Sequence, residues 1–362
     1  MKSLYFIFNV LCSVILVNAQ QFTLETPLDA AINETSGLLY LNNTLITHND
    51  SANTNQLFEI DTTTGNITRT VTLTNATNID WEDLTHDDTY IYIGDFGNNQ
   101  GDRLDLKIYR ITIADYFANT SVTADVINFS YSNQTDFTSS PFATNFDAEG
   151  IIHYNDALYI FSKNWIDGDT NIYQLPKTPG TYSANSIDTI NVQGLISGAT
   201  TNTSNTNIVL TGYDLNGSFL IELSGFNSGI FSNGTVTKTA ISVPSNYSAQ
   251  IEGIIAINTN EYYVSAEENT PDASGLYSIN LSTLSSQIIS SSSLYFYPNP
   301  AQNNITINKD NTVTKIYTTL GQLVKSSTKK QIIISDLVKG IYLIQVEDNL
   351  NKKKFIKRLI ID

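Results

Sequence analysis

Five copies of one strand pattern, spread between Glu34 and Ser290, constrain the fold of this chain more than any other feature. Each copy begins at a small or acidic residue, continues as an apolar strand, turns at Asn or Asp, and returns as a second strand. The strands alternate with a period of two residues and show little helical periodicity. A third strand with an aromatic or aliphatic centre and a weaker fourth strand complete each copy. Equivalent positions in the five copies are Gly37, Asp83, Gly150, Ala199 and Gly253.

Four short strands repeated every ~40–50 residues are typical of a β-propeller. Five blades are visible, and a sixth is possible from residues 111–145 or from the segment Phe22 to Leu28. We expect that N-terminal segment to supply an outer strand that closes the ring instead. A β-sandwich with irregular strands is the main alternative. The sequence thus predicts an all-β chain with a β-propeller over residues 20–290.

The first residues have the features of a secretory signal. Lys2 precedes a nearly continuous apolar stretch from Leu4 to Val17, and small residues up to Ala19 suit cleavage before Gln20. We therefore predict a signal peptide over residues 1–19 and an exported protein. No other segment has the ~18 uninterrupted apolar residues of a membrane helix, so we expect no transmembrane segment in the mature chain. Cys12, the single cysteine, would be removed when the signal peptide is cleaved.

Charge divides the rest of the chain into two modules. Its 19 Lys and Arg and 35 Asp and Glu give a net charge of −16. Eleven of the basic and five of the acidic residues lie from Leu294 onward, so the C-terminal part carries +6 and the preceding part −22. A Ser-rich run separates them, which predicts a linker over residues 291–297 and a second domain over 298–362. Nucleic acid is not an expected partner of so acidic a protein, because phosphate binding needs clustered Lys and Arg.

Acidic residues recur where the predicted innermost strands begin. In a propeller blade, the start of the first strand and the end of the second lie on the same face, so these residues should gather around one axis. Glu82, Glu149 and Glu252, with Asp83 adjacent to Glu82, would repel one another unless hydrated, protonated or bridged by a cation. Their hard oxygens suit Ca²⁺, whereas the scarcity of His argues against Zn²⁺. The alternative is a solvated acidic mouth without metal.

Further polar residues are expected on the same face. They are Glu34, Asp50, Asp95, Lys163, Asp214 and Glu267. The three histidines, His48, His86 and His153, also end or follow strands, and one of them could act as a general base. No nucleophile-elbow pattern is present, so no catalytic residue is assigned.

Several motifs of the acidic module resemble a family of secreted bacterial propellers. They are ETSGL with THNDS, NIDWEDL with YIGDFGNN, FDAEGI with SKNW, and QIEGI with SAEE. The set is similar to uncharacterised phytase-like or esterase-like propellers, and more loosely to calcium-dependent propeller lactonases and phosphotriesterases. The resemblance implies calcium held in the channel by Glu82, Asp83, Glu149 and Glu252. The chain departs from those enzymes in its five visible blades and in lacking their set of channel asparagines.

The basic module opens with Tyr297, Pro298, Asn299 and Pro300, a sequence that excludes regular helix. Alternating strands follow, with Gly321 and Gly340 in turns, which predicts a small antiparallel β-sandwich. The motifs YPNP, IYTTLGQLV, ISDLVKGIYLIQV and KKKFIKRLIID resemble the type A C-terminal sorting domain of the type IX secretion system of Bacteroidetes. That resemblance implies the secretion machinery as a partner and a location outside the cell or on its surface.

Two functions are compatible with these observations. The first is a binding or scaffold propeller whose acidic channel mouth holds calcium and whose polar face binds a glycan or small molecule. The alternative is a calcium-dependent hydrolase of esters, lactones or phosphate esters, in which the ion would polarise a substrate oxygen.

Overall fold

The computed structural model describes residues 20–242, 250–268, 273–281, 287–288, 296–318, 322–348 and 354–361. The chain divides into two compact units, Met1–Ile289 and Ser290–Asp362, which we call the propeller unit and the C-terminal unit. The predicted signal peptide and residues 291–295 of the predicted linker lie outside the described residues. None of the described helices is long and apolar enough to cross a membrane.

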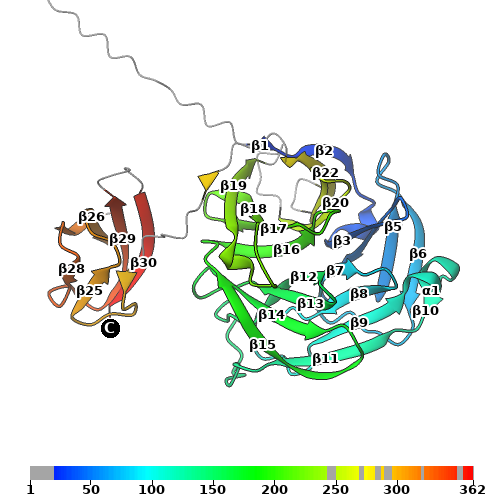
Figure 1. Cartoon of the computed structure of the whole chain (residues 1–362), viewed down its shortest axis with the longest axis horizontal. Helices are drawn as coiled ribbons and strands as arrows, with labels where there is room; N and C mark the ends of the chain where they lie inside the picture. Colours follow the sequence, from blue (N-terminus) through cyan, green and yellow to red (C-terminus); the bar gives the residue numbers. More distant parts are fainter. Residues whose placement is uncertain are drawn as a thin grey trace, which may run out of the picture. The chain divides into compact units, whose positions relative to one another are not determined.

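The propeller unit is built from antiparallel blades of four strands each, and an eight-stranded sheet joins two of the blades (Figure 1). Blade 1 contains β3 (Thr35–Leu41), β4 (Thr44–Asn49), β5 (Gln56–Ile60) and β6 (Ile67–Leu73). Blade 2 contains β7 (Trp81–His86), β8 (Tyr90–Asp95), β9 (Lys107–Thr112) and β11 (Asp125–Tyr131). Blade 3 contains β12 (Ala148–Tyr154), β13 (Ala157–Ser162), β14 (Thr170–Pro176) and β15 (Gly180–Ile190). Blade 4 contains β16 (Leu195–Thr201), β17 (Asn207–Asp214), β18 (Gly217–Ser224) and β19 (Thr235–Ser242). Blade 5 contains β20 (Ile251–Ala256), β21 (Glu261–Ala266), β22 (Gly275–Asn280) and, from the N-terminus, β2 (Thr23–Pro27).

The innermost strands of the five blades close a ring. Each contacts the next in the order β3, β7, β12, β16, β20 and back to β3. The pairing of β2 with β22 joins the N-terminal segment to the last blade, as expected for a closing strand. The β-propeller prediction is therefore confirmed, with five blades in the described residues.

The insert between blades 2 and 3 does not form a sixth blade. It contains α1 (Ile113–Ala118), β10 (Ser121–Val122), which extends blade 1 beside β6, and β11, the outer strand of blade 2. A parallel pairing of β11 with β15 then joins blades 2 and 3 at their outer edges. Short strands β1 (Gln20–Gln21) and β23 (Gln287–Ile288) add to β19, and single turns of 3-10 helix lie at Ala30–Ile32 and Phe231–Asn233.

An apolar core lies between every pair of neighbouring blades. Phe161, Ile196 and Phe219, for example, pack between blades 3 and 4, and four comparable clusters fill the other gaps. A strand in the middle of a blade is covered on both faces, which explains why every residue of β13 is buried. Interlocked cores of this kind hold the inner strands, and thus the channel mouth, in fixed positions.

Each innermost strand has a bulge or irregularity in register near its start. The residues at these irregularities are Ser36, Glu82, Glu149, Ser197 and Glu252. In blade 4 our sequence alignment was therefore wrong by one residue, because Gly198 and not Ala199 is equivalent to Gly253. Both glycines pack against the backbone of the next blade. A Cβ added at Gly198 would lie 2.2 Å from the carbonyl oxygen of Glu252, and a Cβ added at Gly253 would lie 2.3 Å from the carbonyl oxygen of Ser36.

The C-terminal unit is a small antiparallel β-sandwich, as predicted. One sheet contains β24 (Phe296–Tyr297), β25 (Asn304–Ile307) and β28 (Gln331–Ile333). The other contains β27 (Leu323–Ser327), β26 (Thr312–Thr318), β29 (Gly340–Asp348) and β30 (Lys354–Ile361). Buried Ile305, Ile316, Ile344 and Leu359 form the centre of its core.

The Tyr297–Pro300 motif is attached to the last strand of the unit. Pro298 and Pro300 follow cis peptide bonds. Between them, the Asn299 amide donates to the Arg358 carbonyl oxygen at 3.0 Å and accepts from the Ile360 N–H at 2.8 Å. Gly340 begins β29 with φ 151°, in the left-handed region that favours glycine, whereas Gly321 lies outside the described residues.

Candidate metal centre at the channel mouth

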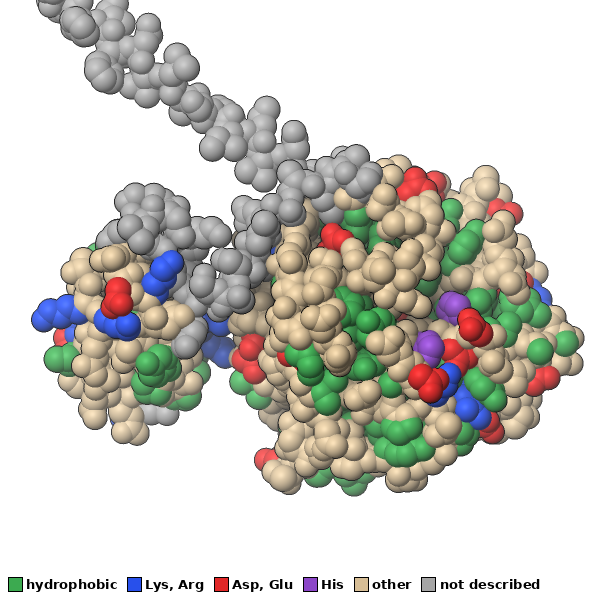
Figure 2. Space-filling model, viewed as in Figure 1, with side chains coloured by type: hydrophobic (Ala, Val, Ile, Leu, Met, Phe, Trp, Pro, Cys, Tyr) green, Lys and Arg blue, Asp and Glu red, His purple; other side chains and the backbone are tan. Residues whose placement is uncertain are grey.

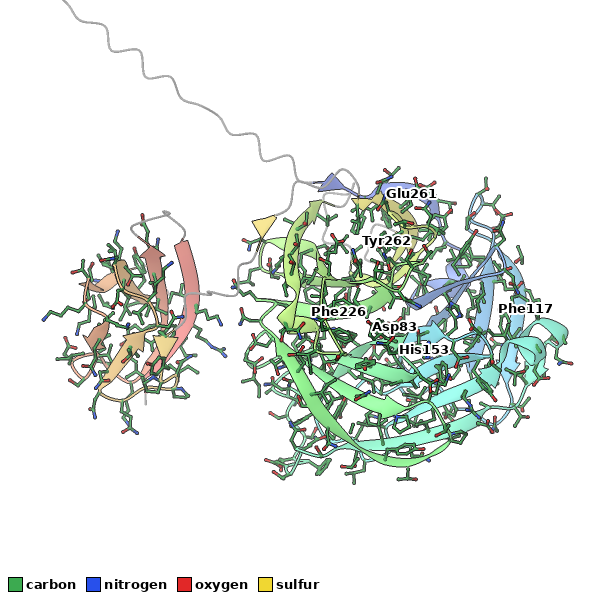
Figure 3. The ribbon with its side chains drawn as sticks, in the orientation of Figure 1. Asp83, Phe117, His153, Phe226, Glu261 and Tyr262 are labelled. Atoms are coloured by element: carbon green, nitrogen blue, oxygen red, sulfur yellow. The ribbon has the colours of Figure 1, made fainter. Side chains whose placement is uncertain are left out.

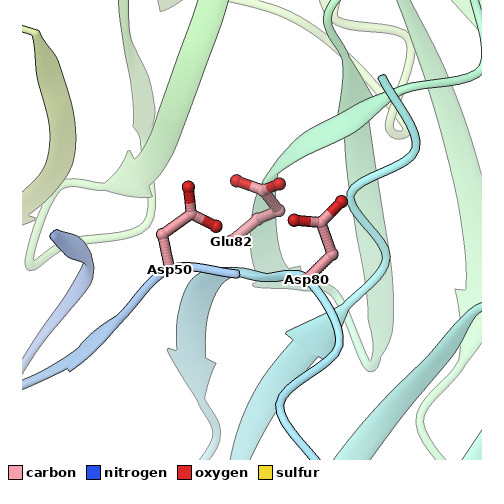
Figure 4. A group of neighbouring side chains, drawn as sticks. All are labelled: Asp50, Asp80 and Glu82. Carbon is pink, nitrogen blue, oxygen red and sulfur yellow. The ribbon is translucent and has the colours of Figure 1, made fainter. Parts of the chain in front are cut away.

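Two groups of carboxylates meet where the innermost strands of blades 2 and 3 begin. Asp50, Asp80 and Glu82 form the first, which we call the open triad (Figure 4). Glu82, Asp147 and Glu149 form the second, which we call the paired triad. Within each triad, one oxygen from each residue lies within 4.8 Å of the others. Glu82 belongs to both, so the two triads are continuous.

Asp80 and Asp147 are the two members that sequence reasoning missed. Each precedes a channel glutamate by two residues, in Asp80-Trp81-Glu82 and Asp147-Ala148-Glu149. In extended chain, side chains two residues apart point to the same side. This repeated Asp-x-Glu spacing was the signal that could have placed both aspartates beside the predicted glutamates.

The paired triad has its own cation and hydrogen-bond donors. Lys163, which follows β13, places its Nζ 3.0 Å from Glu149 Oε1, and both side chains are only 6% exposed. Asp147 accepts from the Asn98 backbone N–H at 2.6 Å and from Trp165 Nε1 at 2.7 Å, one bond to each carboxylate oxygen. The ammonium group of Lys163 therefore offsets part of the negative charge of the paired triad.

Within the described chain, the charge of the open triad is opposed only at longer range, by Lys163 at Asp50 and Asp80 and by Arg103 at Asp80. No Lys or Arg of the described chain forms an ion pair with Asp50, Asp80 or Glu82, although Asp50 accepts the Ser51 N–H. Glu82 is buried, whereas the two aspartates are half-buried, so the triad is reachable from solvent. Gly97 lies directly against it: an added Cβ there would lie 2.0 Å from Glu82 Oε1 and 2.5 Å from the Asp80 carboxylate.

The pKa values of these carboxyl groups show how poorly their charge is compensated. Burial, followed by repulsion from Asp80 and Glu252, raises the pKa of Asp50 to about 8. Burial and the neighbouring Asp147 raise the pKa of Asp80 to about 6, even though Arg103 opposes the shift. Burial and Glu149 raise the pKa of Glu82 well above its usual value. The folded protein thus favours a proton or a further cation at the open triad.

Glu252 and Glu267 of blade 5 extend the acidic surface. Glu252 is 5% exposed, and its buried Oε2 has no hydrogen-bond partner among the described residues. Burial raises the pKa of Glu252, and burial with repulsion from Glu252 and Asp50 raises the pKa of Glu267 to about 9. A buried carboxylate oxygen without a partner is costly and is typical of a site that binds something further.

Asp83 has a structural position that the sequence did not predict. Although it was expected to be a ligand, both its oxygens accept backbone N–H groups, from Leu84 at 2.8 Å, Ile151 at 3.0 Å and Ala199 at 3.2 Å. It lies fully buried near the middle of the ring (Figure 3) and links blades 2, 3 and 4. Asp83 belongs to neither triad, so we do not include it in the proposed metal site.

Replacement of Asp83 by Ala should destabilise the propeller unit by about 3 kcal/mol or more, because three backbone N–H groups in three blades would lose their acceptor. Thermal unfolding followed by circular dichroism measures this loss. The Asp83→Asn variant keeps one acceptor oxygen, so it should lose less stability than Asp83→Ala. Equal melting temperatures for wild type and Asp83→Ala would contradict this role.

Other residues predicted for this face have different partners. Asp95 is buried and forms an ion pair with Arg103 at 2.9 Å, and its Oδ1 also accepts the Asp80 N–H at 3.2 Å. Asp214 forms an ion pair with Lys238 at 2.8 Å. Glu34 is exposed and accepts a hydrogen bond from Asn53. Asp95 therefore supports the open triad indirectly, and the other two lie outside both triads.

None of the three histidines belongs to either triad. His48 is buried against Trp81, with ring centroids 5.7 Å apart, and burial lowers its pKa to about 4. His86 and His153 line a cavity of about 430 Å³ together with Tyr40, Thr201 and Ala256, residues near the ends of the innermost strands. This is the opposite mouth of the channel, and Figure 2 shows His side chains beside acidic and basic ones on the face of the propeller unit in view.

The C-terminal unit is similar to a known protein family. Residues 295–362 match the family described as the secretion system C-terminal sorting domain. The C-terminal unit is a sorting domain. It marks this chain as a secreted cargo of the type IX system, found on the cell surface or outside the cell, and it implies an interaction with that machinery. The prediction from the YPNP and later motifs is thereby confirmed.

Three solved structures are similar to this chain at low sequence identity. PorZ, a surface component of the type IX secretion system of Porphyromonas gingivalis, is 15% identical over 91% of this chain and 45% of its own, with a TM-score of 0.32. An exported protein of Bacteroides fragilis is 11% identical over 72% of this chain and 94% of its own, with a TM-score of 0.36. A quinoprotein alcohol dehydrogenase-like protein of Bacteroides thetaiotaomicron is 12% identical over 83% of this chain and 67% of its own, with a TM-score of 0.34. These similarities are too low to bear on function. A search of curated proteins finds no match.

Proposed function

We propose that the propeller unit is a secreted binding module that holds Ca²⁺ at the open triad and presents this mouth to a polar ligand. The observation that supports it most is the contrast between the two triads. The paired triad has Lys163 as its cation, whereas Asp50, Asp80 and Glu82 converge without one in the described chain.

The donor set of the open triad fits calcium. Ca²⁺ takes six to eight oxygen ligands and accepts carboxylates and waters in flexible geometry. Asp50, Asp80 and Glu82 would supply the protein oxygens, and solvent access to the two aspartates leaves room for water or a ligand. Zn²⁺ fits poorly, since the described site offers neither thiolate nor imidazole. A bound dication would also lower the pKa values that burial has raised.

Titration of the purified secreted protein with CaCl₂ in a calorimeter tests this proposal. We expect one binding event, weakened at least tenfold in Glu82→Gln, which keeps the shape of the side chain and removes its charge. Asp214→Asn is the matched control, because Asp214 was predicted on this face but forms an ion pair with Lys238. Absence of binding, or equal affinity in Glu82→Gln, would contradict the proposal.

Hydrolysis of esters, lactones or phosphate esters is the second candidate function. One observation favours it: Asp50 and Asp80 are half-buried and reachable from solvent, so an ion held there could also contact a substrate oxygen. Turnover in a panel of these substrates, present with Ca²⁺ and lost in Glu82→Gln, would support the hydrolase. Calcium binding without turnover would support the binding module.

A further inference from the structure

An aromatic pair, of which one ring is exposed and the other half-buried, lies beside the carboxylates. Phe142 is 60% exposed, and its ring packs edge-on against Trp165 with centroids 4.8 Å apart. The neighbouring Ile166 is 55% exposed. Large apolar side chains normally pack inward, so an aromatic ring displayed on a loop next to a polar site is typical of ligand-binding surfaces.

The surrounding structure holds this pair in place. Phe142 has φ 55°, an uncommon backbone conformation for a bulky residue, and its N–H donates to the Asn99 carbonyl oxygen at 2.8 Å. The Trp165 backbone N–H donates to the Thr144 carbonyl oxygen at 3.0 Å, and Lys163 Nζ lies 5.1 Å from the centre of its ring. A pre-arranged aromatic surface loses little conformational entropy when a ligand binds.

A short chain of contacts connects the aromatic pair to the open triad. Trp165 Nε1 donates to Asp147 at 2.7 Å, and an oxygen of Asp147 lies within 4.8 Å of one of Glu82. Glu82 in turn belongs to the open triad. The aromatic pair is therefore linked to the open triad through two side chains, Asp147 and Glu82.

We propose that the ligand of this mouth is a neutral oligosaccharide, which stacks on Phe142 and contacts the cation at the open triad through hydroxyl oxygens. This inference rests on the proposed function. Sugar rings offer both apolar C–H faces, which pack on aromatic rings, and paired hydroxyls, which can replace water on Ca²⁺. The carboxylates of the mouth disfavour anionic sugars, since like charges repel.

Calorimetric titration of the secreted protein with neutral hexasaccharides tests the inference. The probes are cellohexaose, laminarihexaose and mannohexaose, each in CaCl₂ and in EDTA. We expect at least one to bind in CaCl₂, with affinity falling at least tenfold in Phe142→Ala and in EDTA. Phe137→Ala is the control, since Phe137 is on the same loop and 37% exposed but outside the aromatic pair.

The outcomes separate this inference from the function on which it rests. Calcium affinity is measured first without sugar, and Phe142→Ala should leave it within twofold. If Ca²⁺ binds but none of the hexasaccharides does, or if Phe142→Ala binds sugar like wild type, the oligosaccharide inference is wrong and the calcium proposal stands. If Ca²⁺ itself does not bind, the proposed function fails.

Discussion

In EDTA, the melting temperature of the propeller unit should fall as the pH rises from 6 to 9, and CaCl₂ should restore it most at high pH. Above about pH 4 the unfolded chain releases the protons of Asp50 and Glu267, whereas burial keeps them on the folded protein until about pH 8 and 9. The folded state thus binds more protons in this window, and stability declines as the pH rises through it. In the proposed site, a bound Ca²⁺ would take the place of the proton on Asp50.

Differential scanning calorimetry at several pH values measures this effect. Calcium at one hundred times its dissociation constant raises the free energy of unfolding by about 2.7 kcal/mol. This corresponds to a rise in melting temperature of roughly 5–10 °C for a unit of this size. Glu82→Gln should lose most of the calcium-dependent rise. If the melting temperature changes neither with pH between 6 and 9 nor with calcium, the prediction is wrong.

Replacement of Lys163 by Met should be the most destabilising single change at the mouth at neutral pH. Lys163 is the buried cation of the paired triad, 3.0 Å from Glu149, and removing one partner of a buried ion pair costs about 3–5 kcal/mol. The carboxyl groups left behind can be neutralised in two ways. Lowering the pH protonates them, and a second Ca²⁺ can occupy the paired triad.

Unfolding at pH 7 and pH 5, together with calcium titration, checks this prediction. We expect Lys163→Met to recover stability at pH 5 and to bind two calcium ions where wild type binds one. Lys330→Met is the control, because its ion pair with Asp310 is exposed and such pairs contribute about 0–1 kcal/mol. A Lys163→Met protein as stable as wild type at pH 7 would show that Lys163 does not neutralise this site.

The repeated strand pattern made the fold predictable, because the apolar residues of each blade must pack against those of the neighbouring blades. The same pattern located Glu82, Glu149 and Glu252 at the starts of the innermost strands. Closing of the ring by β2 was also predictable, since the N-terminal segment had no other partner in the repeat.

The orientation of individual side chains was harder to predict. The irregularity at Trp81–Leu84 sends the neighbours Glu82 and Asp83 in different directions, one to the carboxylates and the other to backbone N–H groups of three blades. Alternation alone cannot place residues at such a point. The ion pairs of Asp95 and Asp214 could not be predicted, because their cations, Arg103 and Lys238, come from positions that the strand pattern does not relate to them.

Anomalous diffraction from crystals of the secreted protein soaked with Tb³⁺, an oxygen-seeking substitute for Ca²⁺, tests the central claim most directly. The structure predicts one strong peak among the carboxylates of Asp50, Asp80 and Glu82, and none at Glu149, where Lys163 supplies the charge. A strong peak at the paired triad with Lys163 displaced, or no peak at the open triad, would contradict the account.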